Sequence, residues 1–175
     1  VNPSCPAQLK RTVAYFAGRD AMDIANFGQT YVDSLVDLGY IRNVSDIYKL
    51  KDHRDALIEQ GIMGKEKNTD KILEAIEKSK ENEAYKLLTG LAIRNVGKIS
   101  AKSLLMHYNS IWELADATVE ELQQLPDVGE ITACSICDYL KKEESKLLLK
   151  ELDACGVNMI VKEQKKASEK LTGLT

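Results

Sequence analysis

The sequence predicts an all-α protein made of repeated helical hairpins, and three observations lead to this fold class. Only three prolines occur, at positions 3, 6 and 126, so no proline interrupts a helical path between residues 7 and 125. Apolar residues recur at helical rather than alternating spacing. A short glycine-bearing motif also repeats along the chain at nearly constant intervals.

The individual helices are indicated by their apolar faces and by their ends. Apolar residues within 72–76 and 87–91 fall on one face of a helix. Helix starts are predicted at Ser110 and Thr118, because each is followed three residues later by a glutamate, and this pairing satisfies the open amides of a first turn. Glycines that we expect to end helices are Gly39, Gly61, Gly90 and Gly156.

Composition limits the class of protein. The chain has 175 residues, of which 44% are hydrophobic and 29% charged, as in a globular protein with its own core. Its four cysteines are too few and too unevenly spread for a disulfide framework, so we expect a cytoplasmic protein. No apolar run or leader pattern predicts a membrane partner. The net charge of −3 does not itself favour nucleic acid, although a local face can still be positive.

The repeated motif consists of a short polar residue, an apolar residue and a glycine, placed between two apolar helical segments. It occurs at residues 26–30, 95–99 and 127–131, with a weaker copy at 63–67. Four residues after the glycine, Ala101 and Ala133 are small enough to let the second helix pack closely on the first. Four units with a period of about 32 to 37 residues predict tandem helix-hairpin-helix repeats.

A helical hairpin of this kind can bind an anion. The first amides of its second helix lack partners within the helix, and the helix dipole adds positive charge there. A phosphate oxygen fits this position. We expect glycine in the turn because a side chain would keep the phosphate away, and because a positive φ there would also favour glycine. Such contacts hold a nucleic-acid backbone without reading its sequence.

The candidate DNA-binding residues are the turn residues and the polar side chains around them. From the first two hairpins they are Arg19, Asn26, Gly28, Gln29, Thr30, Gly64, Lys65 and Lys67. From the last two hairpins they are Arg94, Asn95, Gly97, Lys98, Ser100, Lys102, Gly129 and Thr132. Arg19 and Arg94 could equally form structural ion pairs, and any single glycine turn could simply connect two helices.

Several motifs resemble, in order, the helix-hairpin-helix region of the bacterial NAD-dependent DNA ligases. They are Cys5-Pro6-Ala7-Gln8, then residues 19–24, 46–50, 75–80, 91–97 and 127–129, and they cover roughly residues 1–161. The resemblance implies that Cys5 is the last of four zinc-ligating cysteines, the other three lying outside this sequence. Lys65 stands where the second hairpin of the family has its key glycine. Residues 170–175 resemble the entry to a BRCT domain, so the chain is expected to be an excised segment.

This resemblance gives the expected organisation and function. We predict a zinc-finger remnant at 1–15, hairpin pairs forming two compact lobes at 16–85 and 86–160, and a linker at 161–175. The family seals nicks with NAD, magnesium and zinc, through a lysine in a Lys-x-Asp-Gly motif that this sequence lacks. The segment is therefore expected to hold no cofactor and to catalyse nothing. It would bind nicked double-stranded DNA from the minor-groove side, beside other domains of the same ligase.

Other interpretations of the sequence are less well supported. Cys134 and Cys137 form a lone Cys-x-x-Cys inside a predicted helix, which favours structural cysteines over a metal site. Trp112 lies among apolar residues and is expected to anchor helices, whereas His53 and His107 are isolated. A DNA glycosylase of the hairpin type would need a lysine just after Gly129, where Glu130 and Ile131 stand. A hairpin module of another DNA repair protein and a helical protein-binding scaffold remain open.

Overall fold

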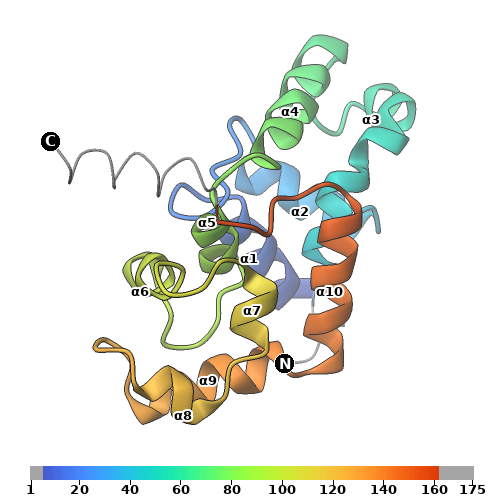
Figure 1. Ribbon diagram of the computed structural model, residues 1–175. Helices are drawn as coiled ribbons and strands as arrows, with labels where there is room; N and C mark the ends of the chain where they lie inside the picture. The colour runs from blue at the N-terminus through green and yellow to red at the C-terminus, as the bar shows by residue number, and fades with distance from the viewer. Residues whose placement is uncertain (1–5, 162–175) are drawn as a thin grey trace, which may run out of the picture.

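A computed structural model describes residues 6–161, and this part of the chain is all-α, as predicted. No helix in it is long and apolar enough to cross a membrane. The elements are α1 (Pro6–Phe16), α2 (Gln29–Asp37), the 3-10 helix η1 (Val44–His53), α3 (Arg54–Gln60), α4 (Glu66–Ser79), α5 (Ala84–Gly90), α6 (Lys98–Leu104), α7 (Ile111–Ala115), α8 (Val119–Gln123), α9 (Glu130–Leu140) and α10 (Glu143–Ala154) (Figure 1). A single isolated bridge joins Ser110 to Ile160 within this region.

The helix ends follow local capping chemistry. Thr118 and Glu121 form the expected reciprocal box at α8, with both hydrogen bonds at 3.1 Å. Ser110 caps α7 by accepting a hydrogen bond from the Glu113 amide at 3.1 Å. Gly61 is the left-handed C-cap of α3, with a φ of 64°. These ends confirm predictions that depend only on residues a few positions apart.

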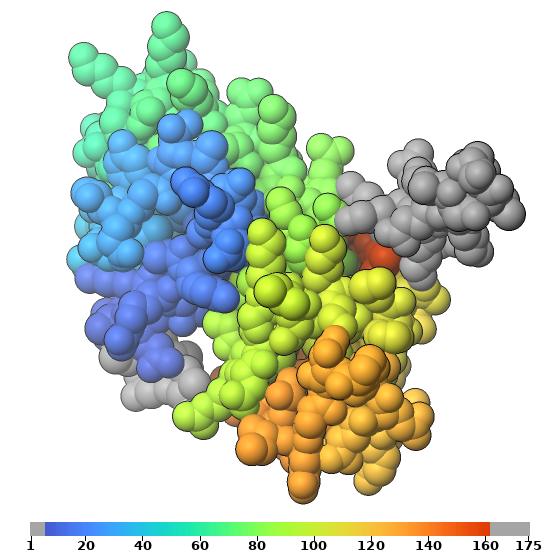
Figure 2. All heavy atoms as spheres, turned by 90° about the vertical axis from the view of Figure 1, so that its left-hand side faces the viewer, coloured from blue at the N-terminus to red at the C-terminus, as the bar shows by residue number. Residues whose placement is uncertain are grey.

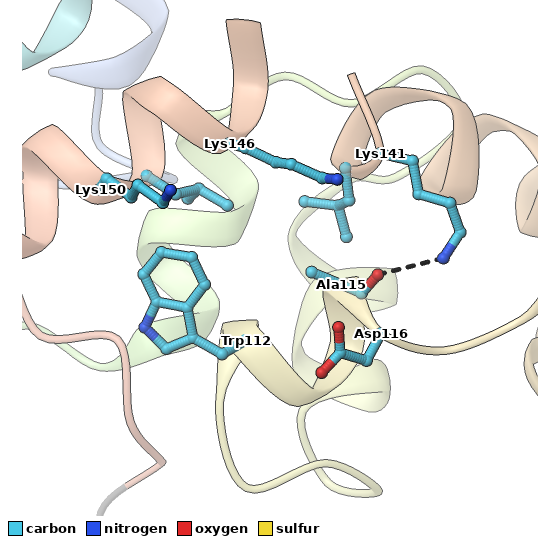
Figure 3. Close-up of a pocket in the computed structure, with 8 residues that line it drawn as sticks. Trp112, Ala115, Asp116, Lys141, Lys146 and Lys150 are labelled. Atoms are coloured by element: carbon cyan, nitrogen blue, oxygen red, sulfur yellow. Dashed lines mark hydrogen bonds between the residues drawn. The ribbon is translucent and has the colours of Figure 1, made fainter. Parts of the chain in front are cut away.

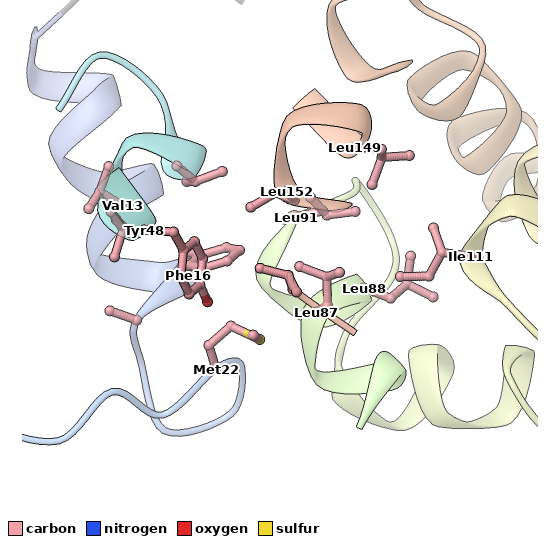
Figure 4. Packing of buried hydrophobic residues seen from close by; sticks show 14 of the residues in the cluster. Val13, Phe16, Met22, Tyr48, Leu87, Leu88, Leu91, Ile111, Leu149 and Leu152 are labelled. Carbon is pink, nitrogen blue, oxygen red and sulfur yellow. The ribbon is translucent and has the colours of Figure 1, made fainter. Parts of the chain in front are cut away.

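The buried apolar side chains form one cluster that draws on helices from both ends of the chain. Phe16 of α1 packs edge to face on Tyr48 of η1, with ring centroids 6.2 Å apart. Figure 4 shows these rings facing Leu87 of α5 and Leu152 of α10. The division into two lobes at 85/86 stays a prediction, and that boundary falls inside α5.

The domain boundaries expected from the sequence stay predictions, and helix α1 lies across the first of them, at 15/16. Residues 6–15 lie in α1, whose Val13 is fully buried in the common cluster, and α1 packs on α2. The described part of the predicted 1–15 segment is therefore helical and packs into the common core. Cys5 and the predicted linker from 162 onward lie outside the described residues.

Candidate nucleic-acid interface

Three glycines occupy the same place at the start of a hairpin's second helix. Gly28, Gly97 and Gly129 are the N-cap residues of α2, α6 and α9, and their backbones are extended, with φ of −86°, −97° and −90°. All three are exposed. The repeat seen in the sequence is therefore a structural repeat. Each of these three motifs places an exposed glycine at the N-cap of the hairpin's second helix.

The positive φ that we expected at these glycines is found elsewhere. Asn26 and Asn95, each two residues before the glycine, have φ of 64° and 68°. Asparagine tolerates this left-handed conformation better than most residues with a side chain. The glycine is thus not required by backbone strain, and that half of the expectation was wrong.

Packing within the protein does not require glycine at these positions either. A Cβ atom built on Gly28, Gly97 or Gly129 would meet no atom within 4 Å among the described residues. Neither φ nor internal contacts exclude a side chain at these glycines. The surface at these turns, which carries no side chain, is therefore open to a group from outside the protein.

The amides at these turns are also open. None of α2, α6 and α9 has a side-chain cap, and the described residues provide no acceptor for the amides of Lys98 and Ile99, or of Glu130 and Ile131. Helices α7 and α8, which do not follow a hairpin turn, differ, because Ser110 and Thr118 cap them. Open amides at a helix start carry partial positive charge and suit an anion.

The second hairpin has a different local chemistry. Its N-cap is Lys65, so this lysine does take the position of the glycine, while Gly64 just before it has a φ of 88°. Arg54 donates to Asp70 at 2.6 Å and to Glu66 at 3.0 Å, which raises the pKa of the guanidinium and lowers the pKa of the Asp70 carboxyl. Two carboxylates bound to one arginine therefore lie near this helix start. At the fourth hairpin Glu130 also lies in the first turn of α9, but no arginine binds it among the described residues.

Several predicted side chains already have partners inside the protein. Gln29 donates to Asp33 at 2.8 Å. Lys98 lies 4.0 Å from Asp20, and the Lys102 ammonium is 5.6 Å from the centre of the Tyr85 ring. The predicted cationic residues with neither an ion pair nor a ring contact among the described residues are Arg19, Lys65, Lys67 and Arg94, and all four are exposed. The assignment of these side chains to DNA contacts stays a prediction.

The third and fourth hairpins are joined by a reciprocal pair of hydrogen bonds. Asn95, in the third turn, donates to Ser135 of α9 at 3.1 Å. Ser103 of α6 donates to Asp127, in the fourth turn, at 3.3 Å. Each turn thus touches the second helix of the other hairpin at the same relative position. Figure 2 shows the segments of these two hairpins, in yellow-green and orange, beside the blue segment of the first hairpin on one face.

Sequence reasoning missed two residues at this face. Ile99 and Ile131 are 84% and 75% exposed, and each lies two residues after its hairpin glycine. The signal was present, because both hairpins contain Gly-x-Ile in the same register. By contrast Ala101 and Ala133 are fully buried, which confirms that small residues allow the two helices of each hairpin to pack closely.

The other candidate features do not join this face. Cys137 is buried, with its thiol donating to the Ala117 carbonyl at 3.6 Å, and burial raises the pKa of that thiol. Cys134 is half-buried, so both behave as the structural cysteines we expected. No group of three or more potential metal ligands occurs among residues 6–161.

A pocket of about 320 Å³ lies at the opposite end of α9 from the fourth turn. Figure 3 shows the half-buried Trp112 of α7 beside Lys146 and Lys150 of α10, with Lys141 donating to the Ala115 carbonyl at 3.3 Å. Trp112 packs against the common core, as expected of a helix anchor. Because α9 has eleven residues, roughly 16 Å separates this pocket from the turn at Gly129.

Comparison with known proteins places this geometry in context. A family model described as a helix-hairpin-helix motif matches residues 86–149, the segment that contains the third and fourth hairpins. The chain is 47% identical to a DNA ligase of Clostridium kluyveri over 99% of its length, and 41% identical to a DNA ligase of Bacillus subtilis over 95%. A DNA ligase of Methylacidiphilum infernorum is 39% identical over 99% of the chain. The chain spans about a quarter of the length of these relatives.

Proposed function

This chain corresponds to a helix-hairpin-helix segment of the bacterial DNA ligases, and we propose from this premise that it binds duplex DNA through the sugar-phosphate backbone. The binding is independent of base sequence and serves to hold a nicked duplex for the rest of the ligase. The observation that carries the proposal is the shared geometry of Gly28, Gly97 and Gly129: exposed, uncapped and free of any internal need for glycine.

Phosphate binding at these turns depends on backbone amides and on the absence of a side chain. An oxygen placed against the turn accepts from the first amides of the helix, and the missing Cβ allows it to approach. Arg94, exposed and three residues before Gly97, adds a flexible cation beside the third turn. Because amides supply much of the attraction, the overall charge of −3 does not oppose this mode of binding.

The third and fourth hairpins address the two strands of one duplex. Their reciprocal bonds, Asn95 to Ser135 and Ser103 to Asp127, hold the two turns in equivalent positions. Two equivalent phosphate contacts on one face suit the two backbones that border a groove. The first hairpin lies beside them and extends the contact along the DNA. The second hairpin, where Lys65 replaces the glycine and Arg54 binds two carboxylates beside the helix start, is a structural connection.

The activity of the complete ligase is proposed from the names of the relatives and from the family resemblance of the sequence. We infer that the parent enzyme seals single-strand nicks in replication and repair, with NAD and magnesium, and that this segment positions DNA for it. Neither the Lys-x-Asp-Gly motif nor a cluster of metal ligands occurs in the described residues, so no chemical step is assigned to this chain. Zinc would involve Cys5, which lies outside the described part of the structure.

Duplex binding as a function of salt tests the proposal. The chain should bind a nicked duplex with an affinity that falls steeply as salt rises, because phosphate contacts release counterions. Gly97→Glu and Gly129→Glu should each weaken binding about tenfold or more, because a carboxylate would stand where the phosphate lies. Circular dichroism should show nearly unchanged helicity in both variants, since a Cβ atom added at either glycine meets no atom within 4 Å.

Leu147→Glu is the matched control, because it adds the same charge on the exposed side of α10. It should bind duplex almost as tightly as the wild type. Equal affinity of all three variants would show that the glycine turns only connect helices. A wild-type affinity that does not depend on salt would argue for a protein-binding scaffold.

A further inference from the structure

Two isoleucines project from the hairpin face without any role in the fold. Ile99 and Ile131 are the second residues of α6 and α9, and at 84% and 75% they are the most exposed large apolar side chains of residues 6–161. Neither can cap its helix, and neither reaches the buried cluster. A first turn usually favours small polar or acidic residues at such positions, so these side chains need another explanation.

A single exposed isoleucine needs no explanation, because folded proteins expose much apolar surface. The matched register of these two is different. Both follow their hairpin glycine by two residues, and the two hairpins are tied in equivalent positions by the bonds of Asn95 and Asp127. The structure thus repeats the same apolar projection twice on one face, beside each of two open turns.

We propose that Ile99 and Ile131 pack against deoxyribose rings, each next to the phosphate that its own hairpin holds. This inference rests on the proposed function and names the part of the nucleotide that the site recognises. A phosphate at the turn places its flanking sugar beside the next residues of the helix. The carbon-bearing edge of deoxyribose is the apolar surface of the backbone, and it is the same for every base.

The contact also accounts for binding by a chain that carries a net negative charge. Apolar area removed from water contributes to affinity without adding charge. The sugar contact is confined to the last two hairpins, because Thr30 and Lys67 stand at the equivalent position of the first two. The third and fourth hairpins therefore form a matched pair that grips sugar and phosphate together.

Ile99→Thr combined with Ile131→Thr tests the proposal on the full chain. Threonine keeps the branched Cβ and copies the residue found in the first hairpin, but it shortens the apolar side chain. We expect this double variant to bind a nicked duplex about tenfold more weakly. The slope of log affinity against log salt should not change, because no phosphate contact is removed. Leu147→Thr, at a 56% exposed apolar site on α10, should bind like the wild type.

A second readout locates the contact. In spectra of isoleucine methyl groups, Ile99 and Ile131 should show intermolecular contacts to sugar protons of the duplex, and Ile160, 60% exposed, should show none. Wild-type affinity in the double variant, with Gly97→Glu still defective, would overturn the sugar contact and leave the proposed function intact. A reduced salt slope in the double variant would also overturn it, since that would mean a lost phosphate contact. Absence of duplex binding by the wild type would instead refute the proposed function itself.

Discussion

Gly90, the last residue of α5, lies directly against Phe16 of α1, so that a Cβ atom on it would be 3.0 Å from Cδ2 of the Phe16 ring. Cβ of Ala21 would be 3.2 Å away on the other side. Phe16 and Ala21 are both buried, so neither can move aside freely. The absence of a side chain at Gly90 therefore allows α5, the first helix of the third hairpin, to pack on α1, the first helix of the first hairpin.

Gly90→Ala should consequently destabilise the protein. Alanine favours a helix, but the clash with Phe16 should outweigh that gain and lower the free energy of unfolding by about 1 kcal/mol. Gly97→Ala is the control, because its Cβ would meet open space, and it should stay within about 0.5 kcal/mol of the wild type. Urea unfolding measures both. A Gly90→Ala protein as stable as the wild type would mean that the Phe16 ring yields.

The turn residue Asn95 should be sensitive for two separable reasons. It has a φ of 68°, and its amide donates to Ser135. Asn95→Ala loses the hydrogen bond and forces alanine into the left-handed region. It should therefore lower the free energy of unfolding by about 1 to 2 kcal/mol. Asn95→Gly keeps the conformation, and Ser135→Ala removes only the bond, so each should cost less. If Asn95→Ala and Ser135→Ala proved equal in urea unfolding, backbone conformation would contribute nothing here.

The contact of Glu151 with η1 should make stability depend on pH. Ser45, fully buried, donates to the Glu151 carboxylate at 2.7 Å, and Lys49 donates at 3.4 Å. These bonds lower the pKa of Glu151 below its ordinary value of 4.5. A carboxyl with a lowered folded pKa contributes stability above its unfolded pKa, and that contribution is lost as pH falls through the folded value.

Glu151→Gln should therefore be less stable than the wild type at pH 7, and the two proteins should converge as the pH falls below about 4.5. Glu74→Gln, at an exposed position in the middle of α4, is the control and should be about as stable as the wild type at pH 7. Thermal unfolding between pH 3 and pH 7 measures the difference. If the difference in stability between the wild type and Glu151→Gln stayed constant across this range, the stabilisation by Glu151 would not be electrostatic.

Thr69 is expected to tolerate loss of its hydroxyl. Its side chain is fully buried in α4, and its Oγ1 has no hydrogen-bond partner among the described residues. Thr69→Val keeps the shape and removes an unsatisfied polar group, so it should raise the free energy of unfolding by about 1 kcal/mol. Thr69→Ser, which keeps the hydroxyl and loses a methyl group, should destabilise. Destabilisation by valine would indicate that the hydroxyl has a bound water.

Much of the fold and the register of the candidate site could be predicted from sequence because they depend on local chemistry. The cap at Thr118, the helix end at Gly61 and the placement of Gly97 and Gly129 at helix starts involve residues only a few positions apart. Helical periodicity and capping are set by neighbouring residues, so they can be inferred from sequence. The replacement of a hairpin glycine by Lys65 was equally local.

Contacts between distant residues decided the rest. The hydrogen bond from Asn95 to Ser135, the carboxylates gathered by Arg54 at the second hairpin and the projection of Ile99 from the surface depend on how helices pack. The helical pattern indicates which residues share a face of one helix, but not which face a partner helix will cover. The sequence by itself thus determined an all-α chain of glycine-led hairpins, and only the tertiary structure decided which of those hairpins stay open to a ligand.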